Sequence, residues 1–139
     1  MQTITQAVML AAHYHDGQTD KGGNPFVFHP LRLMLKALSE EEQVIAILHD
    51  LIEDTSITIS ELERRGFNSE VTAAVEALSR GEHESYDDFI RRIKKNTLAR
   101  RVKILDLQDN VEMVRHKDLD AQREKQLRKY SRALDILLS

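Results

Sequence analysis

The sequence predicts an all-α protein that folds as one compact orthogonal bundle, and three observations support this expectation. Apolar residues recur at helical spacing along nearly the whole chain. No alternating strand pattern of useful length occurs, since the run Phe26-Val27-Phe28 is too short to carry a sheet. The chain has 139 residues, 41% of them hydrophobic, and shows no linker or repeat, so residues 1–139 are expected to form a single domain.

Four of about eight expected helical segments come before Gly66. Pro30 suits the first position of the second helix, and the segment 44–52 is apolar nearly all round, which is typical of a helix buried in the centre of a domain. Thr58-Ile-Ser-Glu61 matches a capping box at the start of the fourth helix, which Gly66 can end. The first two helices carry the apolar stripes Ile4, Val8, Ala11 and Leu31, Met34, Leu35, Leu38.

Four further segments follow the same pattern in the second half of the chain. Apolar stripes run through residues 71–78 and 86–93, and the segments 102–114 and 119–138 complete the bundle. A basic run from Arg91 to Lys103 is typical of a solvated helix face. On the closing helix, Arg128 and Tyr130 are placed where they could reach a bound molecule.

The composition excludes several classes of function. A net charge of −3 argues against a protein that holds nucleic acid by its backbone. The absence of cysteine excludes disulfides, thiolate nucleophiles and cysteine-ligated metals, so any metal must be bound by nitrogen and oxygen. No apolar run approaches the ~18 residues of a membrane span, and no cationic leader is evident, which favours a cytoplasmic protein without a membrane partner.

A cluster of ionisable residues ends the apolar segment 44–52. His49, Asp50, Glu53 and Asp54 share an arc of roughly 140° if helical geometry continues through them. Three neighbouring carboxylates repel one another and are costly to bury, so a positive group is expected among them. A divalent cation fits, because histidine nitrogen and aspartate oxygen are both suitable donors. A His-Asp pair on a helix is common by itself, and it becomes informative only with further motifs.

Two such motifs lie elsewhere in the chain. The glycine-rich stretch from Asp16 ends at His29, and a loop of that length in a helical domain is more often functional than idle. Lys103, Asp106 and Asn110 fall at i, i+3 and i+7, so one helix face presents a cation, a carboxylate and an amide. By itself this stripe is more typical of a surface salt-bridge pattern than of a functional site.

The order of these motifs resembles the HD superfamily of metal-dependent phosphohydrolases. Within it, the chain resembles in particular the hydrolase domain of RelA/SpoT homologues, including their small single-domain members. The similarity runs from about Gln6 to Tyr130. It is carried by His15-Asp-Gly-Gln18, Lys21, Pro25-Phe26, His29-Pro30, His49-Asp50, Glu53-Asp54-Thr55, Lys103-Ile-Leu-Asp106 and Asn110.

The resemblance implies a role for each motif residue. One divalent ion, typically manganese in this family, would be bound by His29, His49, Asp50 and Asp106. Glu53 and Asp54 match the acidic pair that positions and activates the attacking water, and the sequence leaves open which of them does which. Lys21 and Asn110 match positions near the sugar and phosphates of the substrate. The family reaction removes the 3′-pyrophosphate of guanosine tetra- or pentaphosphate, and some small relatives are phosphatases of NADPH.

One position departs from the resembled motif. A basic residue, usually arginine, contacts the purine base in the family, and here Asp20 stands at that position. A carboxylate removes a planar, stacking cation and adds negative charge beside a polyphosphate. The sequence therefore indicates the type of reaction more firmly than it indicates which purine base the substrate carries. An HD nucleotidase or NADPH phosphatase using the same site, and a non-catalytic nucleotide-binding module, stay open as alternatives. In each case the partner is a small-molecule nucleotide.

Overall fold

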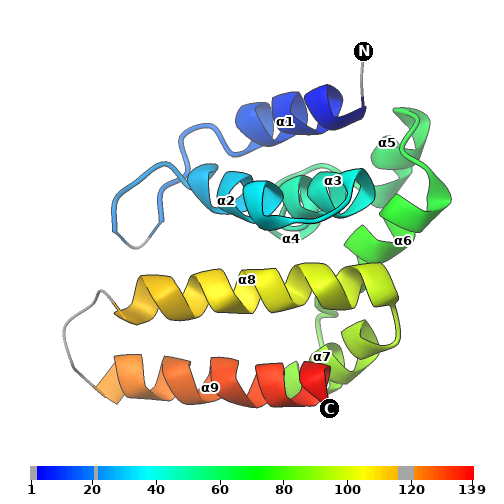
Figure 1. Cartoon of the computed structure of the whole chain (residues 1–139). Helices are drawn as coiled ribbons and strands as arrows, with labels where there is room; N and C mark the ends of the chain where they lie inside the picture. Colours follow the sequence, from blue (N-terminus) through cyan, green and yellow to red (C-terminus); the bar gives the residue numbers. More distant parts are fainter. Residues whose placement is uncertain (1–2, 21, 116–120) are drawn as a thin grey trace.

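The computed structural model describes residues 3–20, 22–115 and 121–139, and these contain nine α-helices, which confirms the all-α prediction (Figure 1). Within these ranges no strand forms, and Thr19 and Pro25 make one isolated antiparallel bridge in the loop after the first helix. None of the described helices is long and apolar enough to cross a bilayer. The helices are α1 (Thr3–Tyr14), α2 (Phe28–Lys36), α3 (Glu40–Leu48), α4 (Leu51–Asp54), α5 (Ile59–Arg64), α6 (Ser69–Ala77), α7 (Tyr86–Lys94), α8 (Thr97–Arg115) and α9 (Ala121–Leu138).

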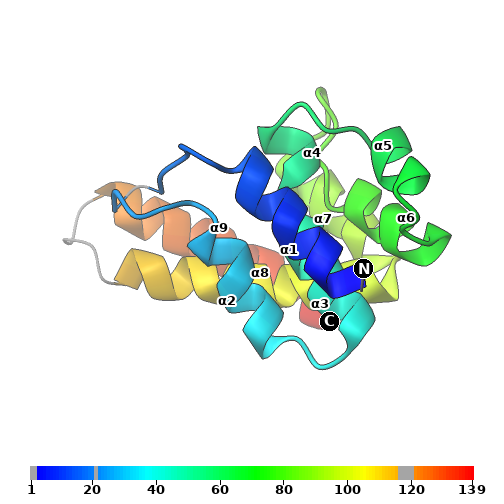
Figure 2. The ribbon, with the colours of Figure 1, turned by 90° about the horizontal axis from the view of Figure 1, so that it is seen from above.

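Helix α3 lies at the centre of the bundle. It packs against α1, α2, α6 and α8. Residues 44–48 are all buried, as the apolar character of this segment predicts, and one buried cluster draws side chains from every helix. The two longest helices, α8 and α9, lie side by side along one face, and α1 crosses above α2 and α3 (Figures 1 and 2).

The predicted continuous helix over residues 44–52 is wrong, because the chain divides it in two. Helix α3 ends at Leu48, and the single turn of α4 begins at Leu51. His49 and Asp50 form the junction, and their backbone angles remain in the right-handed helical region. Hydrophobic periodicity cannot detect such a break, since residues on both sides of it are buried. The junction places the His-Asp pair between two helix ends.

Helix α2 also differs from its prediction. It begins at Phe28, so Pro30 is its third residue and not its first, although still within the first turn, where a backbone N–H has no partner in the helix. The buried face centres on Leu33. Leu35 is 79% exposed because it lies two positions from Leu33 and therefore on the opposite face. Leu38 is 96% exposed because the helix ends at Lys36.

The predicted boundaries of α5 are confirmed. The hydroxyl of Thr58 accepts a hydrogen bond of 3.2 Å from the amide of Glu61, which satisfies one of the free donors at the start of the helix. Gly66 has a φ of 94°, a left-handed conformation that glycine adopts without a steric penalty. The helix therefore ends where the sequence indicates.

Candidate active site

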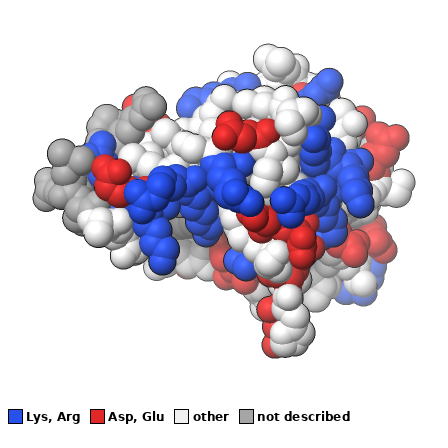
Figure 3. Space-filling model, turned by 90° about the horizontal axis from the view of Figure 1, so that it is seen from below, with Lys and Arg blue, Asp and Glu red and all other residues white. Residues whose placement is uncertain are grey.

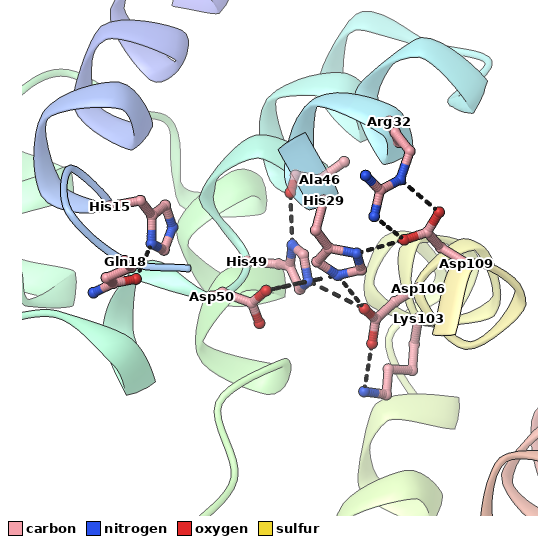
Figure 4. A network of polar contacts seen from close by, with 10 residues as sticks. All are labelled: His15, Gln18, His29, Arg32, Ala46, His49, Asp50, Lys103, Asp106 and Asp109. Carbon is pink, nitrogen blue, oxygen red and sulfur yellow. Dashed lines mark hydrogen bonds and ion pairs between the residues drawn. The ribbon is translucent and has the colours of Figure 1, made fainter. Parts of the chain in front are cut away.

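Four side chains from three separated stretches meet between α2, the α3/α4 junction and α8 (Figure 4). His29 Nε2 lies 2.8 Å from Asp106 Oδ1 and 3.8 Å from Asp50 Oδ2. His49 Nε2 lies 3.0 Å from Asp50 Oδ2 and 3.4 Å from Asp106 Oδ1. Possible ligand atoms of His29, His49 and Asp50 all lie within 4.8 Å of one another. All four residues predicted to bind the metal are thus brought together.

The donor set fits a divalent cation. His49 Nε2 is buried and has no partner with hydrogen-bond geometry, although it faces two carboxylate oxygens. The other ring nitrogen, Nδ1, is 2.6 Å from the carbonyl oxygen of Ala46 and donates to it, which leaves the Nε2 lone pair free. Two imidazole nitrogens and two carboxylates are hard-to-borderline ligands of the kind that divalent first-row metals prefer. No thiol competes, since the chain has no cysteine.

The electrostatics of the metal-free site show how strongly it attracts positive charge. Burial lowers the pKa of His29, but its hydrogen bonds to Asp106 and Asp109 outweigh burial and raise that pKa to about 9. Burial likewise opposes protonation of His49, while Asp50 and Asp106 raise its pKa overall. Both shifts favour positive charge beside the carboxylates of Asp50 and Asp106. A divalent ion would supply such charge in one place.

Lys103 provides a fixed cation beside the cluster. Its Nζ lies 2.7 Å from Asp106 Oδ2, the oxygen that does not face His29. Burial lowers the pKa of Lys103, but the carboxylate of Asp106 raises it overall, so the amine stays charged. Lys103 is only 13% exposed, so it does not belong to the solvated basic face that the sequence indicates for residues 91–103. The pairing holds Asp106 with its other oxygen toward both histidines.

A cavity of about 560 Å³ opens beside the four residues. Asp54, Lys103 and Asn110 line its polar part together with the predicted metal ligands, except for buried His49. Tyr130 of α9 also lines it, whereas Arg128 is 72% exposed and lies 3.9 Å from Glu124. The remaining wall combines apolar and polar residues, among them Phe26, Met113, Val114, Gln126, Thr19 and Asp20. The cavity therefore combines an apolar surface with charged groups.

The two residues of the predicted acidic pair differ in their surroundings. Asp54 faces the cavity, and burial raises the pKa of its carboxyl, as do the nearby carboxylates of Asp50 and Glu53. Glu53 Oε1 instead accepts a hydrogen bond from the backbone amide of Arg80, and Glu53 is not among the residues that line the cavity. Of the two predicted substrate-binding residues, Asn110 lines the cavity, and Lys21 lies outside the described residues.

The loop between α1 and α2 braces α4 and forms one rim of the cavity. Gln18 Nε2 donates to the carbonyl oxygen of Asp54 at 3.1 Å, and Gln18 Oε1 lies 2.8 Å from Nδ1 of the buried His15. Asp20 Oδ1 accepts hydrogen bonds of 2.9 Å from the amides of both Gly22 and Asn24. Asp20 therefore holds the turn of the loop together while it borders the cavity.

Two residues next to the cluster were not predicted from the sequence. Asp109 is 2% exposed, and its Oδ2 lies 2.7 Å from Nδ1 of His29. Arg32 donates two hydrogen bonds of 3.0 Å to the same carboxylate. The available signal was spacing, since Arg32 lies three residues after His29 and Asp109 three residues after Asp106, which places each pair on one helix face.

The basic run of α7 and α8 forms several ion pairs within the chain. Figure 3 shows Lys and Arg gathered in a band, with Asp and Glu close to it, on the face seen from below, where α7 and α9 lie in Figure 1. Several of these cations are paired within the chain, as Arg92 is with Glu84 at 2.8 Å. Within the run, Arg91 also pairs with Asp88 and Arg101 with Glu42, and Arg132 of α9 pairs with Asp87 of α7. Apart from Lys103, the cations of this run are exposed or half-buried, and three of them, Arg91, Arg92 and Arg101, form ion pairs.

The chain is similar in sequence and in fold to SpoT-type proteins. The chain is 34% identical over 84 residues to the bifunctional (p)ppGpp synthase/hydrolase SpoT of Escherichia coli, covering 58% of this chain and 12% of that protein. It is 31% identical over 123 residues to a guanosine-3′,5′-bis(diphosphate) 3′-pyrophosphohydrolase of Aquifex aeolicus, covering 82% of this chain and 18% of the other. A solved structure described as a metazoan ortholog of SpoT that hydrolyzes ppGpp superposes with a TM-score of 0.79, at 20% identity, over 99% of this chain and 86% of the other.

The resemblance predicted from the motifs is confirmed. The chain shares significant sequence similarity with SpoT-type proteins and has the fold of the SpoT-like hydrolase structure. No family model matches the chain. The chain spans less than a fifth of the length of the Escherichia coli and Aquifex aeolicus relatives, whose names therefore describe much longer proteins.

Proposed function

We propose that this chain is a divalent-metal-dependent phosphohydrolase that removes the 3′-pyrophosphate of guanosine tetra- or pentaphosphate. The observation that carries the proposal is the meeting of His29, His49, Asp50 and Asp106 at one end of a cavity large enough for a nucleotide. The names of the relatives support the substrate, and the SpoT-like fold supports the reaction class. We assign the hydrolase domain to residues 1–139, and we place it in the cytoplasm, where its nucleotide substrate would be found.

The four ligand residues would hold one ion, for which we propose Mn²⁺. When bound, such an ion acts as a Lewis acid that polarises a phosphoryl oxygen and lowers the pKa of water. Lys103 sets the orientation of Asp106 through their 2.7 Å contact. Its positive charge, fixed at the cavity wall, also attracts the phosphates of a substrate.

Asp54 is the better placed of the two candidates for the base that takes a proton from the attacking water. It faces the cavity, and burial and the nearby carboxylates raise the pKa of its carboxyl, which makes it a stronger base. The water oxygen bonds to the phosphorus attached at the 3′ position, and the bond from that phosphorus to the 3′ oxygen breaks. Pyrophosphate leaves, the 3′ oxygen takes up a proton, and GDP or GTP remains.

Glu53 would contribute to the same step by positioning Asp54, because the hydrogen bond that Glu53 accepts from the amide of Arg80 fixes the turn that carries Asp54. Asn110 would bind the sugar or a phosphate with its amide from the cavity wall. We assign Lys21, which follows Asp20 in the sequence, to the phosphates on the strength of the motif alone.

The direct test incubates the Mn²⁺-loaded protein with guanosine tetraphosphate and follows the release of pyrophosphate. We expect turnover that is lost in His49→Ala, with Asp87→Ala as a control that changes a surface aspartate paired with Arg132. Release no greater than that of the His49→Ala protein would contradict the proposed substrate. A panel that includes NADPH, scored for phosphate against pyrophosphate, identifies a nucleotidase or phosphatase instead, and binding without turnover identifies a non-catalytic module.

A further inference from the structure

The imidazole of His29 is held from both of its nitrogens. Nε2 faces Asp106 at 2.8 Å, and Nδ1 faces Asp109 at 2.7 Å (Figure 4). His49 and Asp50 lie near Nε2, on the side of the ring away from Asp109. Asp109 is therefore not placed to bind a metal held by the other four residues. It contacts His29, one of the proposed ligands, at the ring nitrogen that faces away from the other three.

Arg32 fixes the position of Asp109. Its Nε donates to Oδ1 and its NH2 group to Oδ2, each at 3.0 Å, so the guanidinium holds both carboxylate oxygens. A two-point contact of this kind fixes the plane of the carboxylate as well as its distance. Arg32 shares helix α2 with His29, and Asp109 shares helix α8 with Asp106, so the set joins two packed helices directly behind the site.

We propose that Asp109 and Arg32 are positioning residues that fix the ring of His29 with Nε2 directed at the metal. An ionised carboxylate can only accept hydrogen bonds, so Nδ1 of His29 must carry the proton that it shares with Asp109. The lone pair of a neutral ring is then left on Nε2, which faces the other ligands. This inference depends on the metal site of the proposed function but not on the identity of the nucleotide.

The two histidines of the site are supported unequally. Nδ1 of His49 donates to a backbone carbonyl, that of Ala46, which carries no net charge. Nδ1 of His29 donates to a buried carboxylate, which makes the ring a stronger donor of electron density to a cation. A buried carboxylate needs a compensating positive charge, and Arg32 supplies it from the edge of the cavity. We therefore expect Asp109 to affect metal affinity more than Arg32 does.

A plain ion pair between α2 and α8 is the competing explanation. Such a pair would contribute to the stability of the fold and leave the metal affinity of the folded protein unchanged. Two matched pairs elsewhere in the chain serve as controls. Glu42 is a buried carboxylate near Arg101, about 10 Å along α3 from His49, and Arg92 holds Glu84 through the same two-point contact that Arg32 makes.

The test is titration of the metal-free proteins with Mn²⁺ by calorimetry, together with thermal unfolding of each protein without metal. Asp109→Asn should weaken Mn²⁺ binding about 10- to 100-fold, the usual effect of losing a residue that supports a metal-bound histidine. Arg32→Lys should weaken it less, since one amine cannot hold both oxygens. Glu42→Gln and Arg92→Lys should bind Mn²⁺ as the unmodified protein does. With Co²⁺ in place of Mn²⁺, the absorption spectrum should change in Asp109→Asn but not in the controls.

Wild-type Mn²⁺ affinity in Asp109→Asn and Arg32→Lys, whatever happens to their unfolding temperatures, would overturn the proposal in favour of the plain ion pair. Equal weakening in Glu42→Gln would also overturn it, because the effect would then follow any loss of buried charge. If the unmodified protein binds no Mn²⁺, the metal site and this inference both fail. If it binds Mn²⁺ but hydrolyses no nucleotide, only the proposed function fails.

Discussion

His29 contacts two carboxylates in the metal-free protein, and its proton reports on the site. With a pKa raised from 6.5 to about 9, the folded protein binds this proton more tightly than the unfolded chain does. The resulting stabilisation is complete below pH 6.5 and is lost as the pH rises through about 9. The pKa of His49 is raised in the same direction.

We therefore expect the unfolding temperature of the metal-free protein to fall between pH 6.5 and pH 9. Thermal unfolding followed by circular dichroism at a series of pH values measures this, with a chelator present to remove metal. His29→Gln should show a shallower fall, because one of the two histidines no longer titrates. An unfolding temperature that stays constant or rises across this range would contradict the electrostatic picture of the site.

Asp20, which stands where the resembled motif has a basic residue, has a structural role that the sequence alone does not reveal. Its Oδ1 accepts from two backbone amides, so the carboxylate acts first as a brace for the turn. Asp20→Asn keeps an oxygen that can accept both bonds and removes a negative charge from the rim of the cavity. The KM for guanosine tetraphosphate should fall roughly two- to tenfold, since the substrate is an anion.

Steady-state kinetics of Asp20→Asn and Asp20→Ala separate the two roles of this residue. The alanine variant loses the acceptor as well as the charge, so the loop should loosen and the KM should rise. A KM in the asparagine variant equal to or above that of the unmodified protein would show that the charge of Asp20 does not oppose the substrate.

At the scale of the elements, helical periodicity indicated the helical segments but not their ends, and it merged α3 and α4 into one helix. The capping residue Thr58 and the left-handed Gly66 bounded α5 correctly, because those signals are local. The break between α3 and α4 left no trace in the pattern, since its helical backbone angles and its buried neighbours match those of a continuous helix. The apolar stripe predicted for α2 continues to Leu38, but the helix ends at Lys36, so Leu38 lies beyond it.

Helix α2 offers a stability prediction with an internal control. Leu33 is fully buried, so Leu33→Ala should lower the free energy of unfolding by about 2–5 kcal/mol through lost contacts and a cavity. Leu38 is 96% exposed beyond the same helix, so Leu38→Ala should change it by less than about 0.5 kcal/mol. Urea denaturation gives both values. Similar losses in the two variants would contradict the packing of α2 described above.

For the molecule as a whole, the site exists only because the fold brings distant stretches together. Residue chemistry indicated a metal near His49 and Asp50, but the participation of His29 and Asp106 was inferred from the order of motifs in a known family. No periodicity predicts that α2 and α8 pack with these side chains facing each other. Asp109 and Arg32 were not predicted for the same reason. Asp109 is 80 residues from His29 and 77 residues from Arg32 in the sequence, and its contacts with both join two helices.

The most direct test of the account is a crystal structure of the Mn²⁺-soaked protein with anomalous diffraction recorded at the manganese edge. The account predicts one anomalous peak with His29 Nε2, His49 Nε2 and a carboxylate oxygen of Asp50 and of Asp106 each about 2 Å away. The peak would also lie on the side of the His29 ring opposite Asp109. A peak elsewhere, or a refined structure in which His29 or Asp106 lies too far away to bind the ion, would contradict the account.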